Sequence, residues 1–207
     1  MMHKEASIEI VHKVDKLMGL LDSLFARKKN IKAHVNKEVS GKCQELLRWK
    51  QYLDRIADAE HYISRKELIA ENAQYSETMK FFLSLDENDI LEDYCLKNGF
   101  DSDSARDLCH QYEHIEEIVA KANDAYVASK LIKEKDYLDN ILRNVDPAVS
   151  LDEDQRKVVL SDEDYSLVVA GAGAGKTTTV AAKVKYLVDK QGINPEQILI
   201  ISFTIKL

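Results

Sequence analysis

Residues that interrupt regular structure are scarce before Pro147. The chain of 207 residues has 2 prolines and 7 glycines, and no proline precedes Pro147. The glycines before it are Gly19, Gly41 and Gly99. Proline and glycine are the residues that most often end a helix. Their scarcity over so long a stretch predicts an all-helical domain covering residues 1–148.

The chain also lacks paired cysteines, long apolar runs and an excess of positive charge. Its 3 cysteines form no CxxC pair, which predicts reduced and mostly buried thiols in a cytoplasmic protein. No apolar run approaches the ~18 residues of a membrane span, and no apolar segment follows the N-terminus as in a secretory signal, so we expect no membrane partner. The net charge of −7 argues against a surface covered with nucleic-acid-binding charge and leaves room for a local basic groove.

Apolar side chains at helical spacing support the all-helical prediction. One stripe consists of Val11, Val14, Met18, Leu21 and Phe25. A second helix is predicted around residues 35–62, and the capping-box pattern Ser64-x-x-Glu67 predicts the start of a third. We expect the stripe to pack within a helical bundle, and docking of a protein partner is the alternative.

Two further signals mark helix ends in this region. The pair Asn98-Gly99 predicts the end of a helix over residues 90–97. The sequence Asp-Ser-Asp-Ser at 101–104 then offers N-cap side chains for a helix predicted to continue as far as Asn144.

The pattern changes after residue 150. A short helix is predicted over residues 151–160 and an acidic loop over 161–166. Two apolar runs, at 167–170 and 198–203, are typical of buried parallel strands, and a helix is predicted between them at 178–190. The order strand, helix, strand predicts a parallel βαβ unit, so residues 149–207 are interpreted as part of an α/β domain.

Between the first predicted strand and the helix, residues 170–177 read Ala-Gly-Ala-Gly-Ala-Gly-Lys-Thr. We call this segment the glycine-rich loop. Its glycines allow the backbone to curl until several N–H groups point at one anion, and the start of the next helix adds its partial positive charge. Lys176 has the reach for the β- and γ-phosphates, and the Thr177 hydroxyl suits one Mg²⁺ coordination position. The segment therefore predicts a site for nucleotide phosphates.

Three segments, in this order, resemble motifs of superfamily 1 DNA helicases of the UvrD/Rep type. Residues 151–159, Leu-x-x-x-Gln-Arg-x-Val-Val, resemble the Q motif. The glycine-rich loop resembles motif I, the Walker A motif, in which this family commonly has alanine where Ala170 stands. Residues 200–204, Ile-Ile-Ser-Phe-Thr, resemble motif Ia, and residues 130–144 are more loosely similar to helicase IV-like members.

The resemblance implies that residues 149–207 begin a RecA-like P-loop ATPase domain with ATP and Mg²⁺ as cofactors. Gln155 would bind the adenine edge, Lys176 the γ-phosphate and Thr177 the Mg²⁺, so Lys176 and Thr177 are the candidate catalytic residues. Thr178 would add a phosphate contact. The phosphates would lie against the backbone of Ala170, Gly171, Ala172, Gly173, Ala174 and Gly175.

The same resemblance implies a single-stranded DNA partner. Its backbone would lie near Ser202, Phe203 and Thr204, with Thr204 the foremost contact. The chain departs from the family at two positions. Ile205 stands where the family usually has asparagine, and Lys183 where it often has arginine, which keeps the charge but loses the planar fork.

The predicted function is that of the N-terminal fragment of an ATP-dependent DNA helicase, moving 3′ to 5′ by resemblance. No Asp-Glu pair after an apolar strand, no arginine finger and no second RecA-like domain are recognisable in the sequence. The chain alone is therefore predicted to bind nucleotide weakly and to hydrolyse it barely. The alternative is a truncated, non-hydrolysing module for nucleotide binding or protein interaction.

One further motif carries a competing chemistry. His110-x-x-Glu113-His114 matches the pattern of inverted zinc proteases and places both histidines on one helical face. Because a zinc site needs at least one more ligand and a supporting fold, an exposed helix face is the preferred interpretation.

Overall fold

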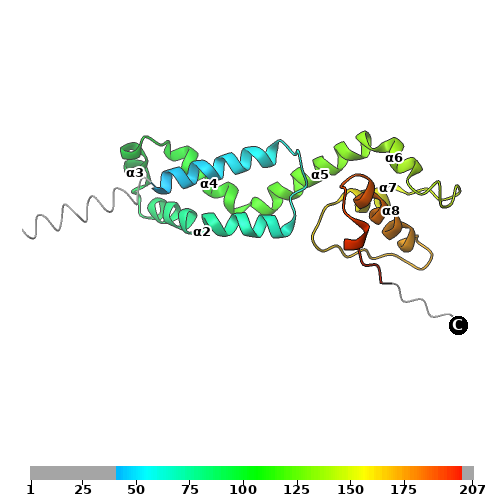
Figure 1. The fold of residues 1–207 in the computed structure, drawn as a ribbon. Coiled ribbons are helices and arrows are strands. Elements are labelled where there is room, and N and C mark those ends of the chain that lie inside the picture. Colours follow the sequence, from blue (N-terminus) through cyan, green and yellow to red (C-terminus); the bar gives the residue numbers. More distant parts are fainter. Residues whose placement is uncertain (1–40, 202–207) are drawn as a thin grey trace, which may run out of the picture. The chain divides into compact units, whose positions relative to one another are not determined.

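The computed structural model describes residues 41–201, and these residues form helices, turns and loops (Figure 1). They divide into two compact units. Unit 1 contains residues 41–49 and Glu77–Leu108, and unit 2 contains Lys50–Ser76 and residues 109–201. The predicted stripe at residues 11–25 and the predicted DNA contacts at 202–204 lie outside the described residues.

The elements follow one another as helices joined by short loops. A helix covers residues 41–57. The others are α2 (Arg65–Glu87), α3 (Leu91–Asn98), α4 (Ser102–Glu113), α5 (Ile115–Lys133), α6 (Lys135–Asn140), α7 (Glu153–Leu160), α8 (Lys176–Asp189) and the 3₁₀ helix η1 (Pro195–Gln197).

Several helix ends lie where the sequence predicts them. The Ser64 hydroxyl accepts the N–H of Glu67 at 3.3 Å at the start of α2. The Asp101 carboxylate accepts the N–H of Ser104 at 2.7 Å at the start of α4. Gly99 ends α3 in the left-handed region with φ 68°, the geometry that favours glycine. Side-chain capping and glycine are thus reliable signals in this chain.

The single long helix predicted from residue 101 to Asn144 is wrong in one respect, because it is divided into α4, α5 and α6. The divisions are single residues, His114 and Glu134, with φ near −100°. The N–H groups of His114 and Glu134 donate to the carbonyls of His110 and Lys130, and their own carbonyls accept the N–H groups of Ile118 and Leu138. Neither position carries proline or glycine, so the sequence has no signal for these breaks.

The two predicted strands are not formed among residues 41–201, so the βαβ unit is not confirmed. Their apolar side chains are exposed, with Leu167 at 89% and Leu199 at 84%. A parallel strand acquires its hydrogen bonds and its buried faces only from neighbouring strands and covering helices. Within the described residues neither run has such a neighbour. The division into domains at residues 148 and 149 stays a prediction.

Unit 1 has its own core. Its largest fully buried side chains include Trp49, Phe82 and Leu46, and the Trp49 indole donates to the Leu108 carbonyl at 3.2 Å. The buried Thr78 hydroxyl is hydrogen-bonded to Lys42 at 3.1 Å and to the Glu45 carboxylate. The three cysteines are buried and form no disulfide, as the sequence predicts.

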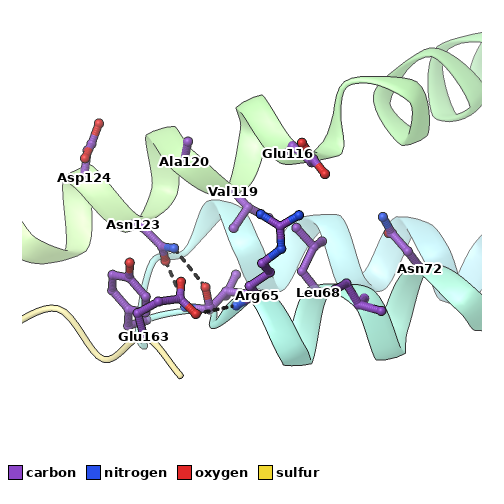
Figure 2. Close-up of a pocket in the computed structure, with 12 residues that line it drawn as sticks. Arg65, Leu68, Asn72, Glu116, Val119, Ala120, Asn123, Asp124 and Glu163 are labelled. Carbon is purple, nitrogen blue, oxygen red and sulfur yellow. Dashed lines mark hydrogen bonds between the residues drawn. The ribbon is translucent and has the colours of Figure 1, made fainter. Parts of the chain in front are cut away.

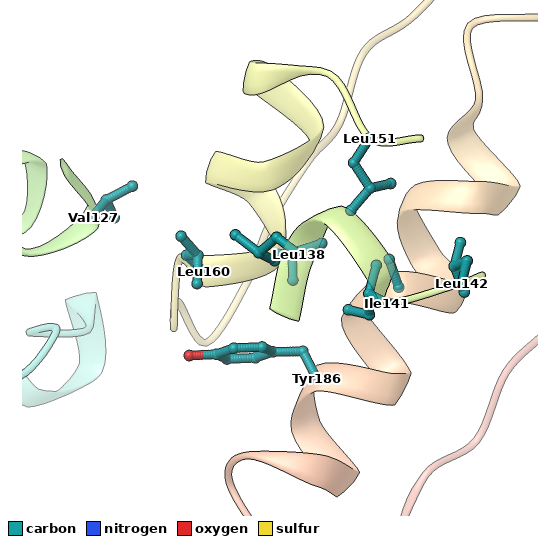
Figure 3. Close-up of a cluster of buried hydrophobic side chains, with 9 residues drawn as sticks. Val127, Leu138, Ile141, Leu142, Leu151, Leu160 and Tyr186 are labelled. Carbon is teal, nitrogen blue, oxygen red and sulfur yellow. The ribbon is translucent and has the colours of Figure 1, made fainter. Parts of the chain in front are cut away.

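Unit 2 has a core that joins α5, α6, α7 and α8 (Figure 3). Its buried members are Val127, Leu138, Ile141, Leu142, Leu151, Val159, Leu160, Ala182 and Tyr186. Polar contacts add to the apolar ones at the α6 end. Arg156 pairs with Asp139 at 2.6 Å, and the Tyr137 hydroxyl donates to Asp189 at 3.0 Å. Segment 134–142 therefore supports both α7 and α8.

A buried amide fixes the segment before α2 to α5 (Figure 2). Asn123 accepts the N–H of Ile63 at 2.8 Å and donates to the Ile63 carbonyl at 2.9 Å. A buried backbone group without a partner is costly, and this one side chain satisfies two of them. Asn123 thus sets where the chain enters α2.

The acidic loop before the glycine-rich loop caps the N-terminus of α2. Glu163 accepts the N–H of Arg65 at 2.9 Å, and Asp164 accepts the N–H of Lys66 at 3.0 Å. The first N–H groups of a helix have no partner inside it, and carboxylates are favoured there. Two segments almost 100 residues apart in sequence are joined in this way.

We predict that Asn123→Ala lowers the free energy of unfolding of unit 2 by about 2–4 kcal/mol, because two buried backbone groups lose their partners. Urea unfolding followed by circular dichroism measures this change. The control is Asn140→Ala, since the exposed Asn140 amide bonds only within its own segment. Equal effects of the two substitutions would contradict the role given to Asn123.

We predict that Asp164→Asn makes stability less dependent on pH in acid. Hydrogen bonds from the Ser64 side chain and from the Lys66 N–H hold the pKa of the Asp164 carboxyl below its ordinary value. Its stabilisation is therefore complete above the unfolded-state pKa of about 4 and is lost as pH falls through the lower folded value. Thermal melts from pH 6 to pH 2.5 test this, with the neighbouring Asp162→Asn as control. An unchanged acid limb in Asp164→Asn would refute the contact.

Candidate nucleotide-binding site

The glycine-rich loop leads directly into α8. Gly173 and Gly175 have φ of 78° and 76°, in the left-handed region that other residues rarely adopt. Gly175 is the N-cap, and α8 begins at Lys176, two residues before the sequence predicts. The loop is mostly exposed, so its backbone and the first turn of α8 face solvent.

The predicted phosphate-binding side chains occupy the first turn of α8. The Lys176 ammonium lies back over the loop, donating to the carbonyls of Ala170 at 2.8 Å and Gly171 at 2.6 Å. Thr177 is exposed and Thr178 is half-buried. The Lys176 ammonium thus already contacts the first residues of the loop, and its charge lies close to solvent.

Thr179 is a contributor that the sequence analysis missed. Its side chain is buried, and its hydroxyl donates to the Gly175 carbonyl at 3.1 Å, the same carbonyl that accepts its N–H at 2.8 Å. These two bonds hold the cap residue of α8 in place. Thr179 lies on the buried face of α8, at helical spacing from Ala182 and Tyr186. This spacing is the sequence signal from which Thr179 could have been predicted.

Gln155 reaches the glycine-rich loop from α7. Its side-chain oxygen accepts the N–H of Asp152 at 3.0 Å while Asp152 caps the N–H of Gln155 at 2.8 Å, which is a complete capping box. The other end of the same amide donates to the Ala174 carbonyl at 3.2 Å. The structure therefore brings together two segments that the sequence predicts to act together.

Lys183 joins α8 to the far end of α7. Its ammonium donates to the carbonyl of Val159 at 3.0 Å and to that of Ser161 at 2.6 Å. Burial lowers the pKa of Lys183, and the charge of Asp162 opposes this change. The sequence marked this position only as a departure from arginine and gave it no partner.

Two further sequence predictions concern residues outside this site or outside the described residues. Ser202, Phe203 and Thr204 lie outside the described residues. The rings of His110 and His114 lie 4.5 Å apart on the helical face that the sequence predicts. No group of three metal-ligating side chains is found in the part of the chain that the structure describes, so the zinc interpretation gains no support.

The arrangement suits a polyanion joined to a flat heterocycle. The first N–H groups of α8 have no helical partner and carry its partial positive charge, and one ammonium and two hydroxyls stand beside them. A side-chain amide lies at the edge of the same loop. Phosphate binding and recognition of a base are therefore chemically compatible at one site.

We predict graded effects of alanine at the three loop glycines. A Cβ on Gly175 would meet the Gln155 amide nitrogen at 2.6 Å, whereas one on Gly171 or Gly173 would meet nothing within 4 Å. Gly175→Ala is expected to cost about 2–3 kcal/mol, from left-handed strain and a displaced hydrogen bond. Gly173→Ala should cost about 1–2 kcal/mol from strain alone, and Gly171→Ala is the near-neutral control. Denaturant unfolding gives the order, and equal costs at all three positions would contradict the loop geometry.

Comparison with known proteins finds a family model that matches part of the chain. Residues 151–207, the segment that holds α7, the glycine-rich loop and α8, match the model of the UvrD/REP helicase N-terminal domain. No solved structure matches the chain. No helix among residues 41–201 is both long and apolar enough to cross a membrane.

Curated relatives match over similarly short segments. The putative ATP-dependent DNA helicase YjcD of Bacillus subtilis is 43% identical over 60 residues, covering 29% of this chain and 8% of that protein. The ATP-dependent DNA helicase UvrD1 of Mycobacterium leprae is 43% identical over 56 residues, covering 27% and 7%. DNA helicase IV of Escherichia coli is 34% identical over 89 residues, covering 43% and 12%.

The chain thus spans only a small fraction of the length of these relatives. The helicase IV match is longer than residues 151–207 and so includes residues before Leu151. The similarity to this relative therefore includes part of the chain outside the segment that matches the family model.

Proposed function

We propose that this chain is the N-terminal part of an ATP-dependent DNA helicase of the UvrD/Rep type. In the proposal, residues 1–148 are a helical accessory domain and residues 149–207 begin the first RecA-like domain. One observation carries the proposal: the Gln155 amide contacts the Ala174 carbonyl beside Lys176, within the segment that matches the helicase domain. The buried cysteines, none of which forms a disulfide, fit the cytoplasmic location that belongs to the same proposal.

Gln155 is proposed to select adenine, in the role of the Q motif. A glutamine amide has two donors and two acceptor positions, and one of each is used by Ala174 and Asp152. One donor and one acceptor remain, which is the pair that binds the N7 and N6 edge of adenine. Such a bidentate pair contributes about 1–3 kcal/mol of discrimination against another base.

The glycine-rich loop is proposed as the Walker A motif. The backbone from Ala170 to Gly175 would surround the phosphates, with Thr178 as an added contact. Lys176 would exchange the carbonyls of Ala170 and Gly171 for γ-phosphate oxygens, which its flexible stem permits. Thr177, exposed on the first turn of α8, would supply one Mg²⁺ ligand.

The apolar runs at 167–170 and 198–201 are proposed to become strands of the RecA-like sheet when further strands lie beside them. Motif Ia would follow the second run, with Ser202, Phe203 and Thr204 near single-stranded DNA. In the whole helicase, ATP hydrolysis would then move the protein along that strand from 3′ to 5′. The helical residues 1–148 would also offer a surface for a protein partner.

We predict that Lys176→Ala weakens binding of MgATP by roughly 10- to 100-fold, because each charge-assisted hydrogen bond to phosphate contributes about 1.5–3 kcal/mol. Titration of the chain with a fluorescent ATP analogue measures the dissociation constant. Lys185→Ala is the control, since Lys185 lies on the same helix and pairs with Asp189. Equal affinity in Lys176→Ala would exclude the phosphate site.

Hydrolysis by the 207-residue chain should be very slow, because its sequence shows no arginine finger, a group that contributes about 10³–10⁵ in rate. Measurable turnover that is lost in Lys176→Ala would contradict this expectation. Sequencing the gene beyond codon 207 tests whether the chain belongs to a helicase. A reading frame that continues to an apolar strand ending in Asp-Glu supports the proposal, and a stop after codon 207 favours the truncated module.

A further inference from the structure

We propose that Lys183 is a positioning residue: by holding the C-terminal end of α7 it fixes Gln155 against the glycine-rich loop and so sets the preference for adenine over guanine. The inference rests on the proposed function, because it names what determines base selectivity at the same site. It does not require Lys183 to touch the nucleotide.

The contacts of Lys183 lie at the end of α7 opposite Gln155. Gln155 is the third residue of α7, and Ser161 is its C-cap. The carbonyls at a helix C-terminus have no partner inside the helix and carry partial negative charge, so a lysine ammonium is favoured there. Lys183 supplies two hydrogen bonds to these carbonyls, at 3.0 and 2.6 Å.

α7 is short enough to move as a rigid rod. Its 8 residues span roughly 12 Å at a rise of about 1.5 Å per residue. The rod is attached to the α8 segment at two points, by Gln155 to Ala174 at one end and by Lys183 to Val159 and Ser161 at the other. Removing the second attachment leaves the first as the direct polar contact described between α7 and the α8 segment, while Arg156 still pairs α7 with Asp139 of α6.

Apolar packing alone does not fix this alignment. Val159, Leu160 and Ala182 are fully buried and hold the two helices together. Such contacts are non-directional, so they permit small sliding and rotation along the helix axis. The two bonds of Lys183 are directional, and the residue is partly buried, so a displaced ammonium would lose both partners at a cost in free energy.

Base selectivity is the property most sensitive to such a displacement. The free donor and acceptor of the Gln155 amide must meet two atoms of the adenine edge at once, whereas phosphate binding depends on the loop backbone and Lys176. Loss of Lys183 should therefore lower discrimination between bases far more than it lowers phosphate affinity. A merely structural role would weaken binding of every nucleotide equally.

The experiment measures dissociation constants of the whole chain for ribose-labelled fluorescent ATP and GTP, each with Mg²⁺. The wild-type chain should prefer ATP by roughly tenfold. Lys183→Met should reduce this ratio to twofold or less, while Lys183→Arg, which still offers several donors to the two carbonyls, should keep most of it. Lys185→Met, two residues along the same helix, should leave the ratio unchanged.

A double substitution separates positioning from folding. In a Gln155→Ala background the ratio should already be near one, and Lys183→Met should not change it further. If Lys183→Met unfolds the chain, Lys183→Gln replaces it, since glutamine keeps a neutral donor, and an intermediate ratio is then expected. Circular dichroism establishes that each variant is folded.

The outcomes distinguish the two proposals. A folded Lys183→Met or Lys183→Gln chain with an unchanged ATP-to-GTP ratio overturns the role of Lys183 and leaves the phosphate site standing. A wild-type chain that binds both nucleotides equally, with binding lost in Lys176→Ala, also overturns the role of Lys183 but supports the phosphate site. A chain that binds neither nucleotide refutes the proposed function itself.

Discussion

One side-chain amide organises the candidate site. Gln155 closes the capping box of α7 through its oxygen and donates to the Ala174 carbonyl through its nitrogen. The close approach requires glycine at 175, because any Cβ there would meet the amide nitrogen at 2.6 Å. A helix start, a loop conformation and a glycine are thus mutually dependent, and the position of Lys176 follows from them. This dependence explains why segments 15 residues apart form one structural unit.

The support for this amide comes mostly from helices that precede the family match. Segment 134–142 packs against both α7 and α8, and the salt bridge from Arg156 to Asp139 fixes the former. The acidic loop, which leads into the glycine-rich loop, is in turn attached to the start of α2 by Glu163 and Asp164. Two parts of the matching segment, α7 and the acidic loop, therefore contact residues outside it. The sequence pattern changes near residue 148, but these contacts cross that boundary.

Much of the fold follows from local sequence signals, namely capping side chains and a glycine at a helix end. Gly99, Ser64 and Asp101 each end or begin a helix where local chemistry requires it. The sequence also predicts the meeting of Gln155 with the loop, through the resemblance. It does not predict the breaks at His114 and Glu134, because neither residue is a proline or a glycine. Nor does it predict Lys183 or Glu163, whose partners are backbone groups distant in sequence.

The two predicted strands are not formed among residues 41–201 for a different reason, which is their dependence on neighbouring strands. This dependence affects which part of the candidate site is organised. A helix closes its own hydrogen bonds, so α7 and α8 form from local sequence and a small shared core. A parallel strand depends on neighbours, and the runs at 167–170 and 198–201 have none among the described residues. The helical side of the site is consequently organised while the strand side is not. In the proposed function, base and phosphate recognition would depend on the first, and coupling to hydrolysis and DNA would depend on the second. Binding without turnover is therefore the behaviour that the proposal expects of this chain.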